Sequence, residues 1–210
     1  MSAGGGILKE YLKAVYALQL ELGYATSQKL SGLLGRPEDW CSRVLSRLEA
    51  MGLVKRLNQQ RGGYVLTPEG RRMLTVVLTG GVFDIIHVGH LATLREAKKL
   101  GNTLVVVVAR DETVRRLKGR SPINREENRL EIVRSLKPVD IALLGDEEDP
   151  YETVRKVRPD IIALGYDQQH NEDEIRGKLA EMGLHARVVR LGVAVPNAKT
   201  SLIISKIQGS

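Results

Sequence analysis

Two histidines three residues apart are the residues in this sequence best suited to chemistry. His87 and His90 follow a Gly-rich turn at the expected start of a helix, so both rings should project from one face of its first turn. The unpaired N–H groups and the positive dipole end of a helix N-terminus favour an anion there. Gly89 removes a side chain where a phosphate would approach, and two imidazoles can donate hydrogen bonds to phosphate oxygens as charge builds in a transition state. The pattern predicts a phosphate-binding site.

Three other interpretations of this turn stay open from the residues alone. The histidines could join Asp84 in a metal site, although zinc usually takes three or four protein ligands and no fourth candidate is nearby in sequence. They could be incidental histidines on a core face, and Gly80-Gly81 could be a tight turn only. The turn contains neither Gly-x-x-x-x-Gly-Lys-Ser/Thr nor Gly-x-Gly-x-x-Gly, which excludes a P-loop and a dinucleotide-binding turn.

The elements around the turn alternate between strands and helices. Short apolar runs predict strands at 76–78, 103–109, 139–144, 160–164 and 187–191. Amphipathic patterns predict helices at 88–100, 125–136, 151–157 and 172–182. This alternation predicts an α/β domain over residues 74–210, a parallel sheet with helices on both faces. Right-handed crossovers then place any ligand at the carboxyl edge of the strands.

Residues 1–73 follow a different order of elements. Residues 1–6 are small and Gly-rich and are expected to be a disordered lead-in. Helices are predicted at 7–22, about 26–34 and 37–51, two short strands at 53–57 and 63–66, and a last short helix at 67–73. An apolar stripe is expected on the third helix, formed by Trp40, Val44, Leu45, Leu48 and Met51. This is the element order of a winged helix-turn-helix domain.

The residues of this first domain also resemble the winged-helix regulators. The resemblance rests on Leu-Ser-Gly-Leu-Leu-Gly at 30–35, Leu-Glu-Ala-Met-Gly-Leu-Val at 48–54 and Tyr-Val-Leu-Thr-Pro-Glu-Gly at 64–70. It implies that the third helix enters the DNA major groove with its N-terminal residues. Arg43 and Arg47 share one helical face and favour contact with DNA, whereas Glu38 and Asp39 repel phosphates. A regulatory or dimerising module with a solvated basic face stays open as the alternative.

Length and composition fit a soluble two-domain protein. The chain has 210 residues and a net charge of +7, with 11 basic and 6 acidic residues before position 74. The excess of basic over acidic residues in this first part indicates either a contact with a polyanion or a solvated surface that keeps the protein soluble. A single cysteine allows no internal disulfide, so a cytoplasmic protein is expected. No apolar run reaches the roughly 18 residues of a membrane-spanning helix, and no signal-peptide pattern is seen at the N-terminus.

The turn at 79–90, Thr-Gly-Gly-Val-Phe-Asp-Ile-Ile-His-Val-Gly-His, resembles the signature of the nucleotidyltransferase superfamily that includes cytidylyltransferases, pantetheine-phosphate adenylyltransferase and FAD synthetases. The resemblance extends over residues 75–207. Four segments, at 108–114, 118–120, 135–140 and 160–168, look most like archaeal FAD synthetases. The resemblance implies a Rossmann-like nucleotidyltransferase domain that joins the AMP part of ATP to FMN and releases pyrophosphate.

The resemblance also implies roles for individual residues. His87, His90 and Lys118 would be catalytic and face the α- and β-phosphates, with Lys118 on a loop after the second strand of the sheet. Arg129 would lie near the phosphates, and Asp167 would bond the ribose or base. Thr200 and Ser201 would meet the β- and γ-phosphates at the start of a last helix. The implied nucleotide-binding set is Gly81, Val82, Phe83, His87, Gly89, His90, Arg129, Asp167, Thr200 and Ser201.

The implied reaction is a direct transfer, in which the acceptor phosphate attacks the α-phosphorus in line and no side chain becomes a covalent nucleophile. A divalent ion, Mg²⁺ or another, would be coordinated largely by phosphates and water, and no protein-held metal is expected. A cytidylyltransferase using CTP and glycerol phosphate or a similar polyol phosphate stays open. So do a DNA-binding regulator whose second domain senses a nucleotide, and a homodimer.

Overall fold

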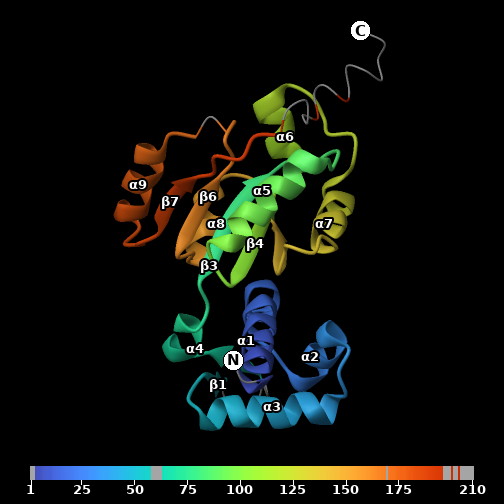
Figure 1. The fold of residues 1–210 in the computed structure, drawn as a ribbon, viewed down its shortest axis with the longest axis vertical. Coiled ribbons are helices and arrows are strands. Elements are labelled where there is room, and N and C mark those ends of the chain that lie inside the picture. Colours follow the sequence, from blue (N-terminus) through green and yellow to red (C-terminus); the bar gives the residue numbers. More distant parts are fainter. Residues whose placement is uncertain (1–2, 58–62, 169, 196–199, 201–202, 204–210) are drawn as a thin grey trace. The chain divides into compact units, whose positions relative to one another are not determined.

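The computed structural model of the chain describes residues 3–57, 63–168, 170–195, 200 and 203 (Figure 1). The chain divides into two compact units, Met1–Leu74 and Thr75–Ser210. Among the described residues, no helix is long and apolar enough to cross a membrane.

The described part of the first unit combines helices with one hairpin. Its elements are α1 (Ala3–Leu22), α2 (Ser27–Leu34), α3 (Glu38–Ala50), β1 (Val54–Arg56), β2 (Tyr64–Leu66) and α4 (Pro68–Arg72). The two strands pair antiparallel. Thr26 caps α2 by accepting a hydrogen bond from the Lys29 amide, and Thr67 caps α4 in the same way through the Gly70 amide. The capping residues explain why these two helices begin where they do.

Two expectations for the first unit are wrong. The lead-in is helical from Ala3 onward, because extending a helix that is already nucleated costs little. On α3, Trp40 and Met51 are exposed, whereas Cys41, Leu45 and Leu48 are buried. These three buried positions follow the i, i+4, i+7 spacing of a single helical stripe, which Trp40 does not share.

The second unit contains a five-stranded parallel sheet in the order β5-β4-β3-β6-β7. Its strands are β3 (Val76–Gly81), β4 (Thr103–Val108), β5 (Ile141–Leu144), β6 (Ile161–Leu164) and β7 (Arg187–Arg190). Its described helices are α5 (Val88–Lys99), α6 (Asp111–Lys118), α7 (Glu126–Arg134), α8 (Pro150–Val157) and α9 (Glu172–Glu181). The predicted α/β class is confirmed.

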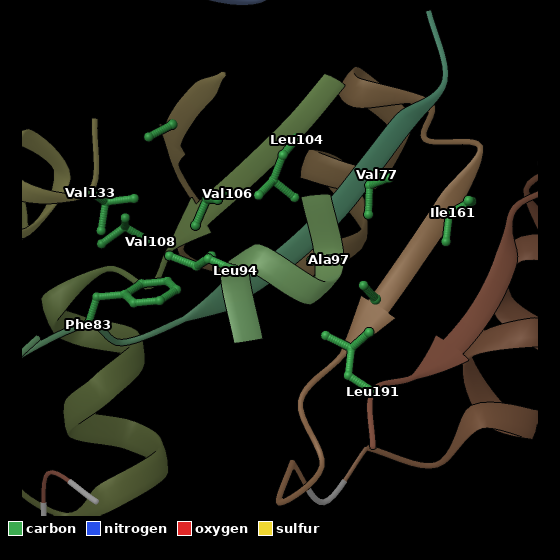
Figure 2. Close-up of a cluster of buried hydrophobic side chains, with 12 residues drawn as sticks. Val77, Phe83, Leu94, Ala97, Leu104, Val106, Val108, Val133, Ile161 and Leu191 are labelled. Carbon is green, nitrogen blue, oxygen red and sulfur yellow. The ribbon is translucent and has the colours of Figure 1, made fainter. Parts of the chain in front are cut away.

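A buried apolar cluster fixes α5 and α7 against one face of the sheet (Figure 2). Alternate residues of β4, Leu104, Val106 and Val108, point into this cluster, together with Leu94 of α5 and Val133 of α7. Packing α5 on the sheet determines where its N-terminus lies, at the carboxyl end of β3. The order of strands also reverses at β3, which has β4 on one side and β6 on the other, so the ligand crevice of such a sheet is expected there.

Helix α6 is the described element of the second unit that the sequence patterns do not predict. It is eight residues long and strongly charged, and its two apolar side chains, Val114 and Leu117, make too short a pattern to predict a helix. Acidic residues occupy its first turn and basic residues its last, which complements the helix dipole. Gly119, at a φ of 65°, ends the helix in the left-handed conformation that glycine adopts without strain. The helix expected after Thr200 lies mostly outside the described residues.

Candidate active site

The turn between β3 and α5 brings the two histidines together at the carboxyl end of the central strand. His87 is the N-cap of α5 and His90 lies in its first turn, with Gly89 between them. The two rings stack, with centroids 3.9 Å apart and planes at 25°. The Phe83 ring lies 5.2 Å from the His90 ring and is buried. A Cβ on Gly81 would come within 3.0 Å of the Phe83 ring, so this close approach favours glycine.

Burial disfavours the charged form of both imidazoles. Desolvation, with the positive charge of His87 and of Lys118 adding to it, lowers the pKa of His90 from 6.5 to about 4. Desolvation also lowers the pKa of His87. The Asp167 carboxylate opposes both shifts. Among the described residues, Nδ1 of each histidine is a buried nitrogen without a hydrogen-bond partner. Unpartnered polar atoms and shifted pKa values on neighbouring residues are typical of functional sites.

Lys118 lies at the C-terminal end of α6 rather than on the expected loop. Its side chain is exposed, and its charge contributes to the lowered pKa of His90. Because an electrostatic effect of this kind falls with distance, Lys118 lies on the histidine side of the unit. Lys118 is thus the last residue of a helix that Gly119 ends, and not part of the loop expected after the second strand of the sheet.

The turn after β6 is fastened to β3 by a glutamine that the sequence patterns do not single out. The Gln168 amide donates from Nε2 to the Gly80 carbonyl at 2.8 Å, and its Oε1 accepts from the Gly165 amide at 2.8 Å. Arg190 of β7 donates to the Gly165 carbonyl at 3.2 Å and to the Gln168 carbonyl at 2.8 Å. These bonds hold the turn that carries exposed Asp167. An arginine set between apolar residues at the end of a predicted strand is the signal in the sequence that could have identified Arg190.

The C-terminal segment reaches the same turn at one described point. The Thr200 hydroxyl lies 3.4 Å from the Ile85 carbonyl oxygen, as a long hydrogen bond. Thr200 is therefore close to the loop that leads into α5. Ser201, its expected companion, lies outside the described residues.

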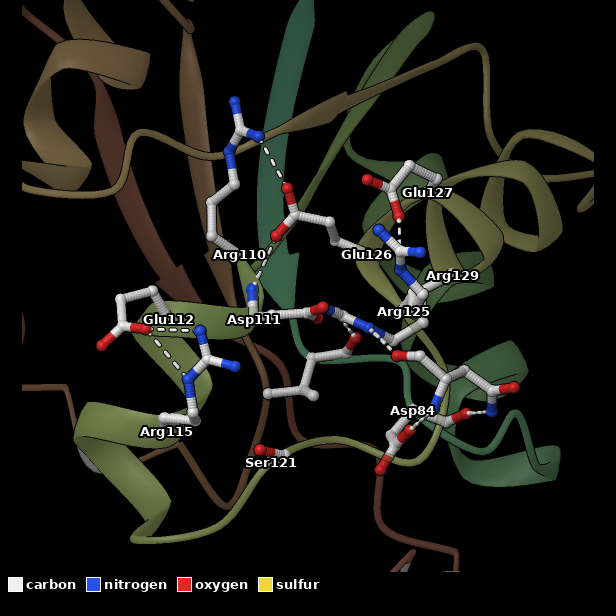
Figure 3. Close-up of polar contacts among 12 residues, drawn as sticks. Asp84, Arg110, Asp111, Glu112, Arg115, Ser121, Arg125, Glu126, Glu127 and Arg129 are labelled. Atoms are coloured by element: carbon white, nitrogen blue, oxygen red, sulfur yellow. Dashed lines mark hydrogen bonds and ion pairs between the residues drawn. The ribbon is translucent and has the colours of Figure 1, made fainter.

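Arg129 is the predicted site residue that the structure places differently. Its side chain is 0% exposed on α7. It donates from Nη1 to the Val82 carbonyl at 2.5 Å, from Nη2 to Asp111 at 2.6 Å and from Nε to the Asn124 carbonyl at 2.9 Å (Figure 3). A guanidinium with these bonds points into the protein and not toward a ligand, because burying an arginine requires that its donors be satisfied internally.

Asp84, considered above as a metal ligand, is likewise engaged within the fold. Its carboxylate accepts hydrogen bonds from the amides of Ile123 and Asn124 at 2.9 Å, and it is buried. The described residues contain no group of three or more His, Cys, Asp or Glu side chains placed to hold a metal ion.

A parallel sheet with this strand order and a His-x-Gly-His helix start at its central strand is the architecture of a nucleotidyltransferase. The chain belongs to the cytidylyltransferase-like family, whose model matches residues 78–206. This confirms the resemblance found in the sequence.

The names of curated relatives are more specific than the name of the family. The chain is 51% identical to the FAD synthase of Thermoplasma acidophilum over 130 residues, which are 62% of this chain and 91% of that protein. It is 46% identical to the FAD synthase of Pyrococcus abyssi over 141 residues, 66% of this chain and 95% of that protein. A solved structure, described as the lipopolysaccharide core biosynthesis protein from Thermoplasma volcanium, is 48% identical. It has a TM-score of 0.57 and covers 58% of this chain and 99% of its own.

Proposed function

We propose that the chain is an FMN adenylyltransferase, which transfers AMP from ATP to FMN and releases pyrophosphate. The observation that carries the proposal is the identity of 46–51% to FAD synthases that this chain spans over nine-tenths of their length. The histidine pair, the α5 N-terminus and Lys118 supply the anion-stabilising groups that such a transfer needs.

The reaction follows from these groups. A phosphate oxygen of FMN attacks the α-phosphorus of ATP, forming the new P–O bond as the bond between the α-phosphorus and the pyrophosphate oxygen breaks. The FMN phosphate is already ionised, so no general base is required. Neutral His87 and His90 donate hydrogen bonds to the developing charge, and the Lys118 ammonium neutralises the triphosphate. The residues act through placement and charge.

The remaining predicted residues complete the nucleotide site in this proposal. Asp167 bonds the ribose or base of ATP, and Thr200 with Ser201 meets the β- and γ-phosphates. The nucleotide comes close to the backbone at four residues, Gly81, Val82, Phe83 and Gly89. Mg²⁺ fits as an ion carried in with the nucleotide, because it prefers oxygen ligands and keeps several waters, so phosphate oxygens and water can coordinate it without a protein ligand. When bound, the ion adds positive charge at the triphosphate.

The experiment that tests the proposal uses the full chain. The purified protein is incubated with ATP, Mg²⁺ and FMN, and FAD and pyrophosphate are quantified. Parallel reactions contain CTP with glycerol phosphate, the substrates of the cytidylyltransferase alternative. FAD formation supports the proposal. Turnover of CTP and glycerol phosphate without turnover of FMN would keep the reaction class and replace the substrates.

For the first unit we propose a winged helix-turn-helix domain that binds duplex DNA weakly, in a cytoplasmic protein. The specific observation in favour is an exposed basic face on α3, where Arg43 and Arg47 are both solvent-exposed beside an exposed Trp40. Arg43 is paired with Asp39 at 2.8 Å, which reduces the charge offered to DNA. The test is a shift assay with duplex DNA at low and physiological salt, and absence of binding even at low salt would favour a scaffold or homodimerisation role.

A further inference from the structure

Helix α6, which carries Lys118, has little apolar packing to hold it in place. It is eight residues long, Val114 is its buried side chain, and Leu117 is 75% exposed. Short helices depend on tertiary contacts for stability, and here those contacts are mainly polar. The position of Lys118 therefore depends on the bonds that fix the two ends of α6.

The first turn of α6 is tied to α7 by four charged side chains. Glu126 accepts from the Arg110 guanidinium at 2.7 Å and from the Asp111 amide at 2.7 Å. Asp111 in turn accepts from the buried Arg129 guanidinium at 2.6 Å. Figure 3 shows this chain of bonds running from Arg110 through Glu126 and Asp111 to Arg129.

The same guanidinium is tied to the turn that precedes the histidines. Arg129 donates to the Val82 carbonyl, five residues before His87, and to the Asn124 carbonyl. Asn124 bonds Asp84 twice, because its amide N–H donates to the carboxylate at 2.9 Å and its side-chain amide donates to the Asp84 carbonyl at 2.6 Å. The segment after α6 is thereby fastened to the histidine turn.

We propose that Arg129 is a positioning residue whose bonds to Val82, Asn124 and Asp111 set the place of Lys118 against the histidine pair. The planar guanidinium group has several N–H donors and suits this role, because one side chain can bond three segments at once. Arg129 acts through Lys118 and does not touch the nucleotide. The inference rests on the proposed function for its kinetic test and on the fold alone for its structural test.

A double-mutant cycle separates positioning from phosphate contact. Asp111→Asn weakens the tie between Arg129 and α6, seven residues from Lys118, and is expected to lower kcat/KM about tenfold or more, since small misplacements of catalytic groups have large kinetic effects. In a Lys118→Ala background the same change is expected to cost about twofold or less, because the group it positions is gone. A loss of equal size in both backgrounds would overturn the proposal.

Glu112→Gln is the matched control. This substitution removes one negative charge from the same turn of α6, but the Glu112 side chain pairs with Arg115 on the exposed surface. It is expected to leave kcat/KM unchanged in both backgrounds. If Asp111→Asn does not fold, Arg129→Lys replaces it, because it keeps the buried charge with one nitrogen in place of three. The same dependence on Lys118 is expected, and its absence would refute the proposal.

Hydrogen exchange tests the placement without any substrate. The α6 amides of residues 114–118 are expected to exchange faster in Asp111→Asn than in the unchanged protein or in Glu112→Gln, while the β3 and β4 amides keep their protection. Unchanged exchange in α6 would overturn the proposal. Hydrogen exchange needs no turnover. A protein that fails to make FAD would therefore contradict the proposed function, whereas the exchange result would still test the role of Arg129.

Discussion

His90 is expected to remain uncharged down to a pH near 4 in the ligand-free protein, and a bound triphosphate is expected to raise its pKa. Burial of the ring beside Phe83 penalises the charged imidazolium, and His87 and Lys118 add positive charge nearby. A triphosphate brings negative charge to the same place, so it should favour the protonated form. Asp167→Asn should lower the pKa of both histidines, because the Asp167 carboxylate raises both.

The sign and size of the linked stability effect follow from the same numbers. The ordinary pKa is 6.5 and the folded value is about 4, so between these two pH values the unfolded chain binds the proton and the folded protein does not. The free energy of unfolding therefore falls as the pH drops from 6.5 toward 4, and His90 costs no stability above that range. One full proton is worth about 1.4 kcal/mol per pH unit, which is the largest slope that His90 can contribute. Because the ring is partly solvated, we expect roughly half of the total loss that a shift from 6.5 to about 4 implies.

The assay is an NMR titration of the imidazole resonances with and without ATP, together with urea unfolding from pH 7.5 to 4.5. His90→Gln assigns the resonance and should flatten the pH slope of the free energy of unfolding. His185→Gln, which removes an exposed histidine, is the control and should leave the assigned His90 resonance in place. A His90 midpoint near 6.5, or a midpoint that ATP leaves unchanged, would refute the reasoning.

Three further results are expected. His90→Ala should keep the near-ultraviolet circular dichroism of the protein and lower kcat about a hundredfold, as loss of a transition-state hydrogen-bond donor does, and near-normal turnover would contradict this. Gln168→Glu should raise the KM for ATP about tenfold, because it leaves the Gly80 carbonyl without its donor, and an unchanged KM would show that this bond does not hold the nucleotide site. Arg43→Ala/Arg47→Ala should weaken duplex binding and its salt dependence in a shift assay, whereas no binding by the unchanged protein at low salt would favour a scaffold.

The strands and the histidine turn could be predicted because their signals are local. The run Thr-Leu-Val-Val-Val-Val of β4 is β-branched and apolar, and it is a strand buried on both faces of the sheet. The His-x-Gly-His spacing brings both imidazoles together at the start of one helix, with His87 at the N-cap and His90 in the first turn. Such features depend on neighbours within a few residues, which a single sequence contains.

The roles of Arg129 and Gln168 could not be predicted, because they depend on partners far along the chain. Arg129 bonds Val82 across 47 positions, and Gln168 bonds Gly80 across 88. A sequence shows that an arginine is present, but burial decides whether its charge faces a ligand or the backbone. Helix α6 could not be predicted for a related reason, because polar bonds to α7 hold it in place where other helices are held by a buried apolar stripe.

Formation of FAD by the full chain tests the central claim most directly. With ATP, Mg²⁺ and FMN, the protein should produce FAD and pyrophosphate in equal amounts, and His90→Ala should reduce both together. Release of pyrophosphate with CTP and glycerol phosphate, but none with ATP and FMN, would contradict the assignment of an FMN adenylyltransferase.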